Sequence, residues 1–177
     1  LIGFGRISRG VAELASAFGM EVRAFDPFVS AEQAAEQGCR MYDDVDDVFR
    51  SCTHISVHCN LSDDTHHLVN ANRLAMMPGS APDGTDCGNH VVNCARGGIV
   101  DEIAVLDALD DGTLASAALD VFEVEPAGDN PLLLHEGFHG SPHIGAATLE
   151  AQTRVGTEMA GLLISFFEGE RPESAIN

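Results

Sequence analysis

The sequence predicts an α/β fold in which a doubly wound parallel sheet carries helices on both faces. Short apolar runs alternate along the 177 residues with stretches of helical periodicity. A glycine turn follows the first apolar run, and charged residues follow several of the later runs. Strands that alternate with helices of this length indicate a parallel sheet covered on both sides.

The expected elements follow one another as strand, helix, strand along the whole chain. After the first short strand, residues 6–18 place apolar side chains at helical spacing up to a stop at Gly19. A capping box of Ser30 and Gln33 begins the next helix. In full, we expect strands at 21–25, 54–58, 91–94 and 115–121, and helices at 6–18, 30–37, 44–51, 72–77, 102–110 and 148–168. The turn-rich residues 78–90 predict a loop.

The start of the chain predicts a truncated domain. The sequence begins at Leu1, without Met, and the first turn already arrives at Gly3. A buried strand usually has about five residues. We therefore expect residues 1–177 to be one domain that lacks its N-terminal part, including half of its first strand.

Composition and charge exclude several classes of protein. The net charge is −19, with 28 acidic residues against nine basic ones, all of them Arg. Such a chain repels nucleic acids and anionic lipid, so we expect neither as a partner. No apolar run approaches the ~20 residues of a membrane helix. An acidic surface without Lys suggests a halophilic source.

Five cysteines without a C-x-x-C pair argue against a zinc ribbon or a disulfide framework. A reducing compartment follows, and we expect a cytoplasmic protein. Three histidines, His135, His139 and His143, repeat every four residues, but Gly137 and Pro142 break any helix there. We therefore expect no metal site.

The glycine turn predicts a dinucleotide site of the Rossmann type. The residues GFGRIS approximate G-x-G-x-x-G between a strand and a helix. Gly3 permits the tight turn, Gly5 lets the backbone approach a pyrophosphate, and the helix start at Arg6 and Ile7 offers N–H groups to it. Ser8 replaces the third glycine and is still small. An ordinary tight turn with two glycines remains the alternative.

Asp26 predicts which dinucleotide binds. It ends the second strand about 20 residues after the turn, where a carboxylate accepts hydrogen bonds from the adenosine ribose. The same carboxylate repels the 2′-phosphate of NADP, and no Arg or Lys follows within residues 27–30. We expect NAD as the cofactor, with a capping Asp before Pro27 as the alternative.

Three motifs in the second half carry candidate chemistry, each after an expected strand or before the long helix. They are NCARGGIVDE at 93–102, ALDVFEVEP at 118–126 and SPHIGAATLEAQ at 141–152. Together with GFGRI, they make the chain resemble the NAD-binding domain of the D-isomer-specific 2-hydroxyacid dehydrogenases. HIGAATLEAQTRV and the closing ESAIN most resemble the 3-phosphoglycerate dehydrogenases of that family.

The resemblance implies catalytic roles for three residues. The family's Arg matches Arg96, its His matches His143, and its Glu, which stands directly before a Pro, matches Glu125 rather than Glu123. Arg96 would bind the carboxylate of a 2-hydroxy or 2-keto acid, and His143 would exchange the proton while Glu125 orients its ring. Taken singly, these residues also suit an ion-pair Arg, a loop acid and a turn His.

The resemblance further implies cofactor contacts and missing parts. Thr65 and Asp120 match family positions beside the cofactor, and we include Cys94 with them. The substrate domain would lie largely outside this chain, and the whole protein would be a homodimer. Glyoxylate or hydroxypyruvate reductases of the same family stay open as alternatives, as do its NAD(H)-responsive corepressors. His66 and His67 are expected in a solvated loop.

Overall fold

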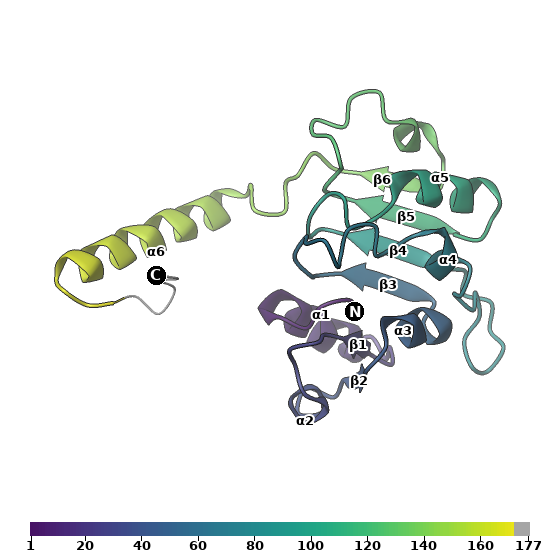
Figure 1. The fold of residues 1–177 in the computed structure, drawn as a ribbon, viewed down its shortest axis with the longest axis horizontal. Coiled ribbons are helices and arrows are strands. Elements are labelled where there is room, and N and C mark those ends of the chain that lie inside the picture. Colours follow the sequence, from purple (N-terminus) through teal and green to yellow (C-terminus); the bar gives the residue numbers. More distant parts are fainter. Residues whose placement is uncertain (172–177) are drawn as a thin grey trace. The chain divides into compact units, whose positions relative to one another are not determined.

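The computed structural model describes residues 1–171, which form two compact parts. The first comprises residues 1–142, and the second begins at His143. The first contains the sheet and most of the expected helices, and the second contains one long helix (Figure 1).

The sheet of the first part is parallel throughout its described strands. These are β1 (Arg23–Phe25), β2 (Arg40–Tyr42), β3 (His54–Val57), β4 (His90–Asn93), β5 (Ser116–Leu119) and β6 (Phe138–Gly140). Ile2 forms parallel bridges to both Phe25 and Val57 and so lies between β1 and β3. The order is therefore β2, β1, Ile2, β3, β4, β5, β6, which is the order of dinucleotide-binding sheets.

This order has a direct consequence for ligand binding. The chain moves outward from Ile2 on one side through β1 and β2, and on the other side through β3 to β6. Ligands of such sheets bind at the carboxyl ends of the strands, where the direction reverses. The glycine turn after Ile2 stands at that place. The expected α/β fold is confirmed, and Ile2 pairs with a strand on each side of it.

The helices lie close to their expected positions. They are α1 (Arg6–Ala17), α2 (Ala31–Ala35), α3 (Val45–Ser51), α4 (Ala71–Leu74), α5 (Glu102–Asp110), the 3₁₀ turn η1 (Pro131–Leu134) and α6 (Leu149–Phe167). The predicted capping box is present, since Ser30 Oγ accepts from Gln33 N and Ser30 N donates to the Gln33 side chain. The expected bounds of α5 match the observed ones.

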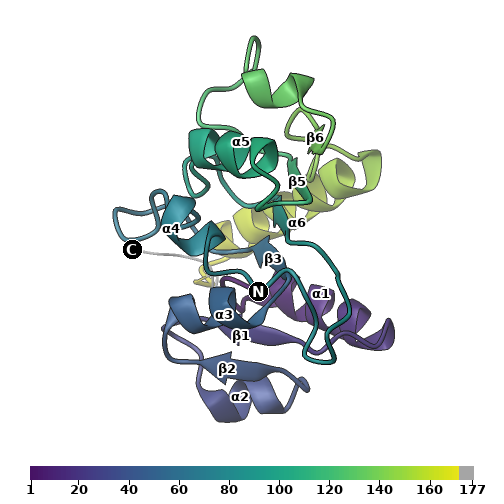
Figure 2. The ribbon, with the colours of Figure 1, turned by 90° about the vertical axis from the view of Figure 1, so that its right-hand side faces the viewer.

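Within the first part, α3, α4 and α5 lie on one face of the sheet and α1 lies on the other (Figure 2), and the apolar core is correspondingly divided in two. The larger cluster joins β3, β4 and β5 to α3, α4 and α5 and includes Phe49, Ile55 and Val105. The smaller cluster joins α1 and α2 to β1 through residues such as Phe4 and Ala12. The sheet therefore holds the glycine turn rigidly between two packed layers.

Two strands were not expected from the sequence. β2 is an edge strand of three partly exposed residues, and β6 has one buried residue, Phe138, ahead of two exposed ones. Neither is a run of apolar residues, so both depend on pairing with a neighbouring strand. The expected loop at 78–90 is present up to Asn89, whose buried side chain accepts from Gly79 N and donates to Thr113 O.

In the second part, α6 runs for 19 residues, and none of them is buried. Thr148 Oγ1 caps it by accepting from Ala151 N at 3.1 Å. His135 follows η1 and His139 lies in β6, so no helix joins these two histidines. This agrees with the prediction made from Gly137 and Pro142.

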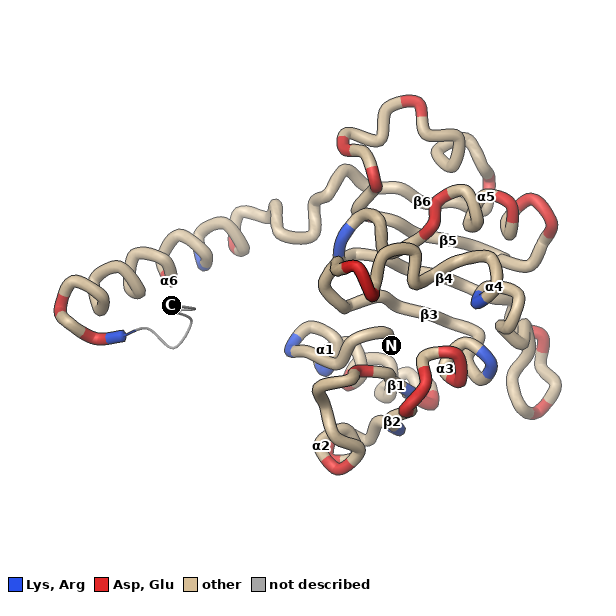
Figure 3. The backbone as a smooth tube through the Cα atoms, in the orientation of Figure 1, with Lys and Arg blue, Asp and Glu red and all other residues tan. Residues whose placement is uncertain are grey.

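Acidic residues are spread over most elements of the described chain and outnumber the Arg residues (Figure 3). Several acids occupy the first turns of α2, α3, α5 and α6, where the helix dipole favours them. The first turn of α1 has none. Among the residues described, no helix has the length and apolar character needed to cross a membrane.

Candidate nucleotide-binding and active site

The glycine turn packs tightly on its inner side and is open on its outer side. Gly3 has φ +90°, and a Cβ there would lie 2.8 Å from the backbone nitrogen of Cys59. A Cβ on Gly5 would meet nothing within 4 Å. Gly5 is the N-cap of α1, and no side chain caps this helix start. The exposed backbone N–H groups therefore suit a pyrophosphate, as the sequence predicts.

Ser8 and His58 line the inner side of the turn. Ser8 is fully buried on α1, in keeping with a small residue at the third motif position. His58 follows β3, and its Nε2 lies 2.9 Å from Ser56 Oγ. Burial, with a smaller contribution from the N-terminal amine, lowers the pKa of His58 to about 4. The ring is therefore neutral at physiological pH.

Asp26 connects the end of β1 to the glycine turn. Its Oδ2 accepts a hydrogen bond from Phe4 N at 2.7 Å, and its Oδ1 accepts from Phe28 N at 2.9 Å. Each carboxylate oxygen has a second lone pair, and the residue is only half-buried. The carboxylate is thus oriented by the backbone and still able to accept ribose hydroxyls. The turn and Asp26 together fit the adenosine and pyrophosphate parts of NAD.

The turn that carries Arg96 depends on the buried side chain of Asn93 at the end of β4. Asn93 Oδ1 accepts from Ala95 N and Asn93 Nδ2 donates to Arg96 O, both at 2.9 Å. Arg96 itself is exposed, and its Nη1 donates to Ala95 O at 2.6 Å. The guanidinium is therefore presented at the carboxyl end of the sheet.

The segment with Glu125 lies directly against that turn. A Cβ on Gly97 would come 1.8 Å from Phe122 O, so only glycine allows this approach. Glu125 Oε1 accepts from Phe122 N at 3.1 Å. Arg96 and Glu125 therefore belong to two loops that touch through Gly97 and Phe122.

Asp120 is buried at the end of β5, between these two loops and β6. Its backbone nitrogen donates to Asn93 O at 3.0 Å, and its Oδ1 accepts from Ser141 Oγ at 2.6 Å. Cys94 is exposed nearby, and partial burial together with the charge of Asp120 raises the pKa of its thiol. Cys94 is therefore a neutral thiol at this edge of the sheet.

Thr65 holds its own loop together. Its Oγ1 accepts from Ser62 N and donates to Asn60 O, both at 2.7 Å. Thr65 therefore organises the loop after β3, and its predicted role near the cofactor stays a prediction.

His143 opens the second part of the chain and has φ +55°, in the left-handed region. The first part thus brings together the glycine turn, Asp26, Arg96, Asp120 and Glu125 at one edge of one sheet. His143 is described in the second part, and its role stays a prediction.

Two residues with contacts to the Glu125 loop were not assigned a role by sequence reasoning. His66 and His67 lie in a turn, as expected; His66 is exposed, and the partly exposed His67 also has its Nε2 2.8 Å from Glu123 Oε1. Glu102 accepts a hydrogen bond from Glu123 N at 2.6 Å. Glu123 lies 56 residues from His67 and 21 residues from Glu102 in the sequence, so no local sequence pattern predicts these two contacts.

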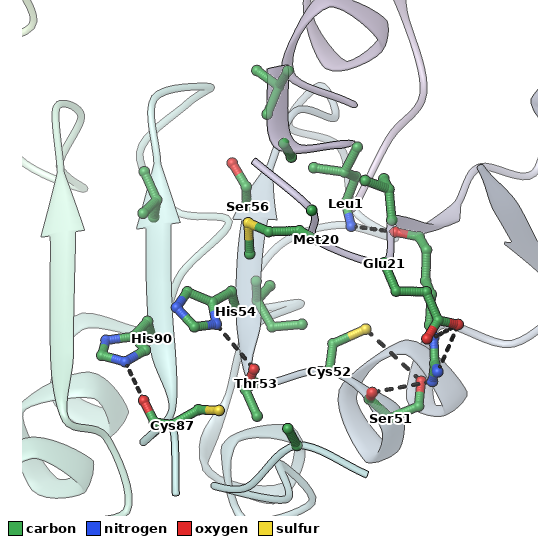
Figure 4. A pocket seen from close by; sticks show the side chains of 18 of the residues that line it. Leu1, Met20, Glu21, Ser51, Cys52, Thr53, His54, Ser56, Cys87 and His90 are labelled. Atoms are coloured by element: carbon green, nitrogen blue, oxygen red, sulfur yellow. Dashed lines mark hydrogen bonds and ion pairs between the residues drawn. The ribbon is translucent and has the colours of Figure 1, made fainter. Parts of the chain in front are cut away.

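A separate cavity of about 530 Å³ lies over one face of β3 and β4, beside α1, and extends past the starts of the two strands (Figure 4). It is lined by Thr53 and His54 at the start of β3 and by His90 at the start of β4, with the end of α1 beside them. The rings of His54 and His90 have centroids 4.4 Å apart. The lining contains neither the glycine turn nor Asp26, Arg96 or Glu125, so the cavity is distinct from the candidate nucleotide site.

Known proteins resemble this chain over its whole length. The D-3-phosphoglycerate dehydrogenase of Bacillus subtilis is 42% identical over 177 residues, and that of Methanocaldococcus jannaschii is 39% identical. Each alignment covers 100% of this chain and 32% of the relative. The chain therefore spans about a third of the length of these relatives.

Solved structures share the fold. A D-lactate dehydrogenase from Treponema pallidum has a TM-score of 0.83 and 32% identity, covering 99% of this chain and 54% of the other. A D-isomer specific 2-hydroxyacid dehydrogenase from Lactobacillus delbrueckii, solved in its NAD-complexed form, has a TM-score of 0.84 and 28% identity, with the same coverage.

The family model described as the NAD binding domain of the D-isomer specific 2-hydroxyacid dehydrogenases matches residues 1–145. That range contains the glycine turn, Asp26, Arg96, Glu125 and His143. The chain belongs to the D-isomer specific 2-hydroxyacid dehydrogenase family and contains its NAD-binding domain.

Proposed function

We propose that this chain is the NAD-binding part of an enzyme that transfers a hydride between NAD(H) and a D-2-hydroxy acid or its 2-keto acid. The observation that carries the proposal is the meeting of two loops at the edge where NAD fits. Gly97 and Phe122 place the turn of Arg96 against the loop of Glu125. When bound, the nicotinamide supplies or accepts the hydride.

Arg96 is the proposed anchor for the substrate carboxylate. A guanidinium offers two parallel N–H donors to a carboxylate, a geometry that an ammonium group does not have. Asn93 supports this role, since its buried amide holds the backbone on both sides of the turn.

His143 and Glu125 form the proposed acid–base pair. In reduction, the imidazole gives a proton to the carbonyl oxygen of the keto acid, and in oxidation it takes the proton from the hydroxyl. Glu125 would orient the ring and stabilise its charged form, as a triad carboxylate does. Asp120 and Cys94 are proposed to lie beside the nicotinamide, and Thr65 to organise a loop that lines the cofactor.

3-Phosphoglycerate is the proposed substrate, because the relatives that are about 40% identical bear that name. Such an enzyme would act in serine synthesis. Glyoxylate and hydroxypyruvate are the alternative substrates within the same reaction class. Most substrate contacts would come from a further domain of the whole protein, beyond residues 1–177.

The setting of the enzyme is part of the same proposal. The family resemblance supports a homodimer, and the cysteine pattern supports the cytoplasm. The net charge of −19 supports a salt-adapted protein that binds neither nucleic acid nor anionic membranes.

The test is turnover of a panel of 2-keto acids with NADH by the whole protein, including 3-phosphohydroxypyruvate, hydroxypyruvate, glyoxylate and pyruvate. We expect one of them to be reduced, and His143→Ala to lower kcat by about 10²- to 10⁴-fold with NADH affinity unchanged. A whole protein that binds NADH and reduces none of the panel would overturn the proposal in favour of an NAD(H)-responsive binding module.

A further inference from the structure

We propose that Glu102 and His67 are positioning residues that fix the loop carrying Glu125. The inference rests on the proposed function, because it assigns to these two side chains the placement of the carboxylate that acts on His143. Neither residue is expected to touch substrate or cofactor. Both residues form hydrogen bonds to Glu123 of the loop, and Glu102 also forms one to Asn130.

Glu102 uses both oxygens of one carboxylate to hold the chain on either side of Glu125. Its Oε1 accepts from Glu123 N at 2.6 Å, two residues before Glu125. Its Oε2 accepts from Asn130 Nδ2 at 2.5 Å, five residues after it. Asn130 is itself fixed, because its Oδ1 caps η1 by accepting from Leu132 N at 3.0 Å. One side chain therefore ties together both ends of the segment.

The support under Glu102 is rigid. Glu102 is half-buried in the first turn of α5, and this helix is capped by Asp101, whose Oδ1 accepts from Ile103 N and Ala104 N. Val105 and Ala108 of α5 are buried in the larger core cluster. A carboxylate based on a packed helix holds a loop more firmly than one based on another loop.

His67 holds the same loop from the other side. Its Nε2 lies 2.8 Å from Glu123 Oε1, and its Nδ1 lies 3.7 Å from Asp101 Oδ2. Both neighbours are carboxylates, which accept hydrogen bonds, so the proton on Nε2 is donated to Glu123. The backbone of His67 is anchored as well, since its nitrogen donates to Gly98 O at 2.8 Å.

The backbone that these contacts hold is the backbone that orients Glu125. Glu125 Oε1 accepts a hydrogen bond from Phe122 N, and Phe122 directly precedes Glu123, which Glu102 and His67 hold. The Phe122 carbonyl is in turn packed against Gly97 of the Arg96 turn. Without these contacts, the peptide between Phe122 and Glu123 could move, and the Glu125 carboxylate would lose its fixed orientation. A displacement of about 1 Å in such a group lowers turnover by up to about a hundredfold.

The experiment is a double-mutant cycle in the whole protein, read by keto-acid turnover and NADH titration. Glu102→Ala is expected to lower kcat about ten- to a hundredfold and to leave NADH affinity within about twofold. Glu102→Gln keeps an acceptor for Glu123 N and should recover part of the loss. His67→Asn, which suits the positive φ of 48° but is too short to reach Glu123, should also lower kcat.

The matched control is Glu32→Ala. Glu32 is an acid in the first turn of α2, so its removal costs a similar interaction with the helix dipole and no contact with the Glu125 loop. Its kcat should equal that of the unmodified protein. An equal loss of kcat in Glu32→Ala and Glu102→Ala would overturn the inference.

The decisive comparison is made in a Glu125→Gln background. If Glu102 acts through Glu125, Glu102→Ala should add less than about a twofold further loss there. Fully additive losses would overturn the inference and leave the proposed function standing. Normal turnover by Glu125→Gln alone would overturn the proposed role of Glu125, and the positioning role would fall with it.

Discussion

The Oδ2 atom of Asp26 accepts a hydrogen bond from the backbone nitrogen of Phe4 at 2.7 Å. The residue proposed to bind the adenosine ribose is thus attached to the middle of the turn proposed to bind the pyrophosphate. A shift of either one would move the other, so the two halves of the nucleotide site form one unit.

Asp26 should make the protein select NAD over NADP. We expect NAD to bind at least about tenfold more tightly, a difference of about 1.4 kcal/mol, because the carboxylate repels the 2′-phosphate. Asp26→Asn should narrow that ratio, as titration of both cofactors by fluorescence would measure. Asp83→Asn is the control, since Asp83 also accepts a backbone N–H, from Thr85, in a loop away from the turn. Equal affinity of the unmodified protein for both cofactors would refute the role of Asp26.

Gly5→Ala should impair NAD binding without destabilising the fold. The added methyl group meets no atom of the chain, so the melting temperature should stay the same. It would occupy the space through which the pyrophosphate approaches, and NAD affinity should fall at least about tenfold. Gly10→Ala, on the same helix and equally unhindered, is the control and should bind NAD normally. Normal NAD binding by Gly5→Ala would place the pyrophosphate elsewhere.

Arg96→Lys should raise the KM for the keto acid about tenfold or more and leave NADH affinity unchanged. Lys keeps the charge and loses the planar fork that holds a carboxylate by two bonds. Steady-state kinetics of the whole protein would separate the two constants. Arg50→Lys, on α3 in an exposed pair with Asp47, should behave like the unmodified protein. A loss of NADH affinity with an unchanged KM would contradict the proposed contact.

His58 should make the 177-residue chain sensitive to mild acid. Burial lowers its pKa in the folded chain to about 4, against 6.5 for an unperturbed histidine. Its contribution to stability is therefore complete above pH 6.5 and is lost as pH falls from 6.5 through about 4, because the unfolded chain binds the proton first.

Urea unfolding at pH 7 and pH 5 would measure this loss. The free energy of unfolding should differ between pH 7 and pH 5, and His58→Gln should reduce that difference by on the order of 1 kcal/mol. This figure allows for solvent screening of the partly exposed ring. His66→Gln, at an exposed ring, is the control. An unchanged pH dependence in His58→Gln would show that other groups cause it.

Salt should stabilise the protein strongly. The 28 acidic residues repel one another across a surface with nine basic ones, and ions screen that repulsion. We expect the melting temperature to rise markedly between low and molar KCl. Sucrose, which stabilises folded proteins by exclusion and does not screen charge, is the control and measures the part of the rise that is not electrostatic. A melting temperature indifferent to KCl would remove the proposal of a salt-adapted source.

Local patterns in the sequence were sufficient for most of the fold. The capping box of Ser30 and Gln33 involves residues three apart, and the bounds of α5 are set by Asp101 before it and Gly112 after it. The glycine turn was predictable for the same reason, because a positive φ at Gly3 is a property of the turn itself. Such features need no knowledge of distant partners.

Features that depend on distant partners were not predictable. β2 and β6 are too short and too polar to stand out, and they exist because β1 and β5 offer them free edges. The buried amide of Asn93 resembles any motif residue until its two bonds around the turn are seen. The hydrogen bond between Glu102 and Asn130 spans 28 residues of sequence. Both residues lie in loops or at helix ends, where sequence patterns carry little information.

The close approach of Gly97 to Phe122 has a consequence for anyone who exchanges parts between members of this family. No side chain can be added at position 97 without displacing a backbone carbonyl of the other loop. The segments 93–102 and 120–130 should therefore be exchanged together. A chimaera that takes only one of them would pair two loops whose backbones do not pack against each other.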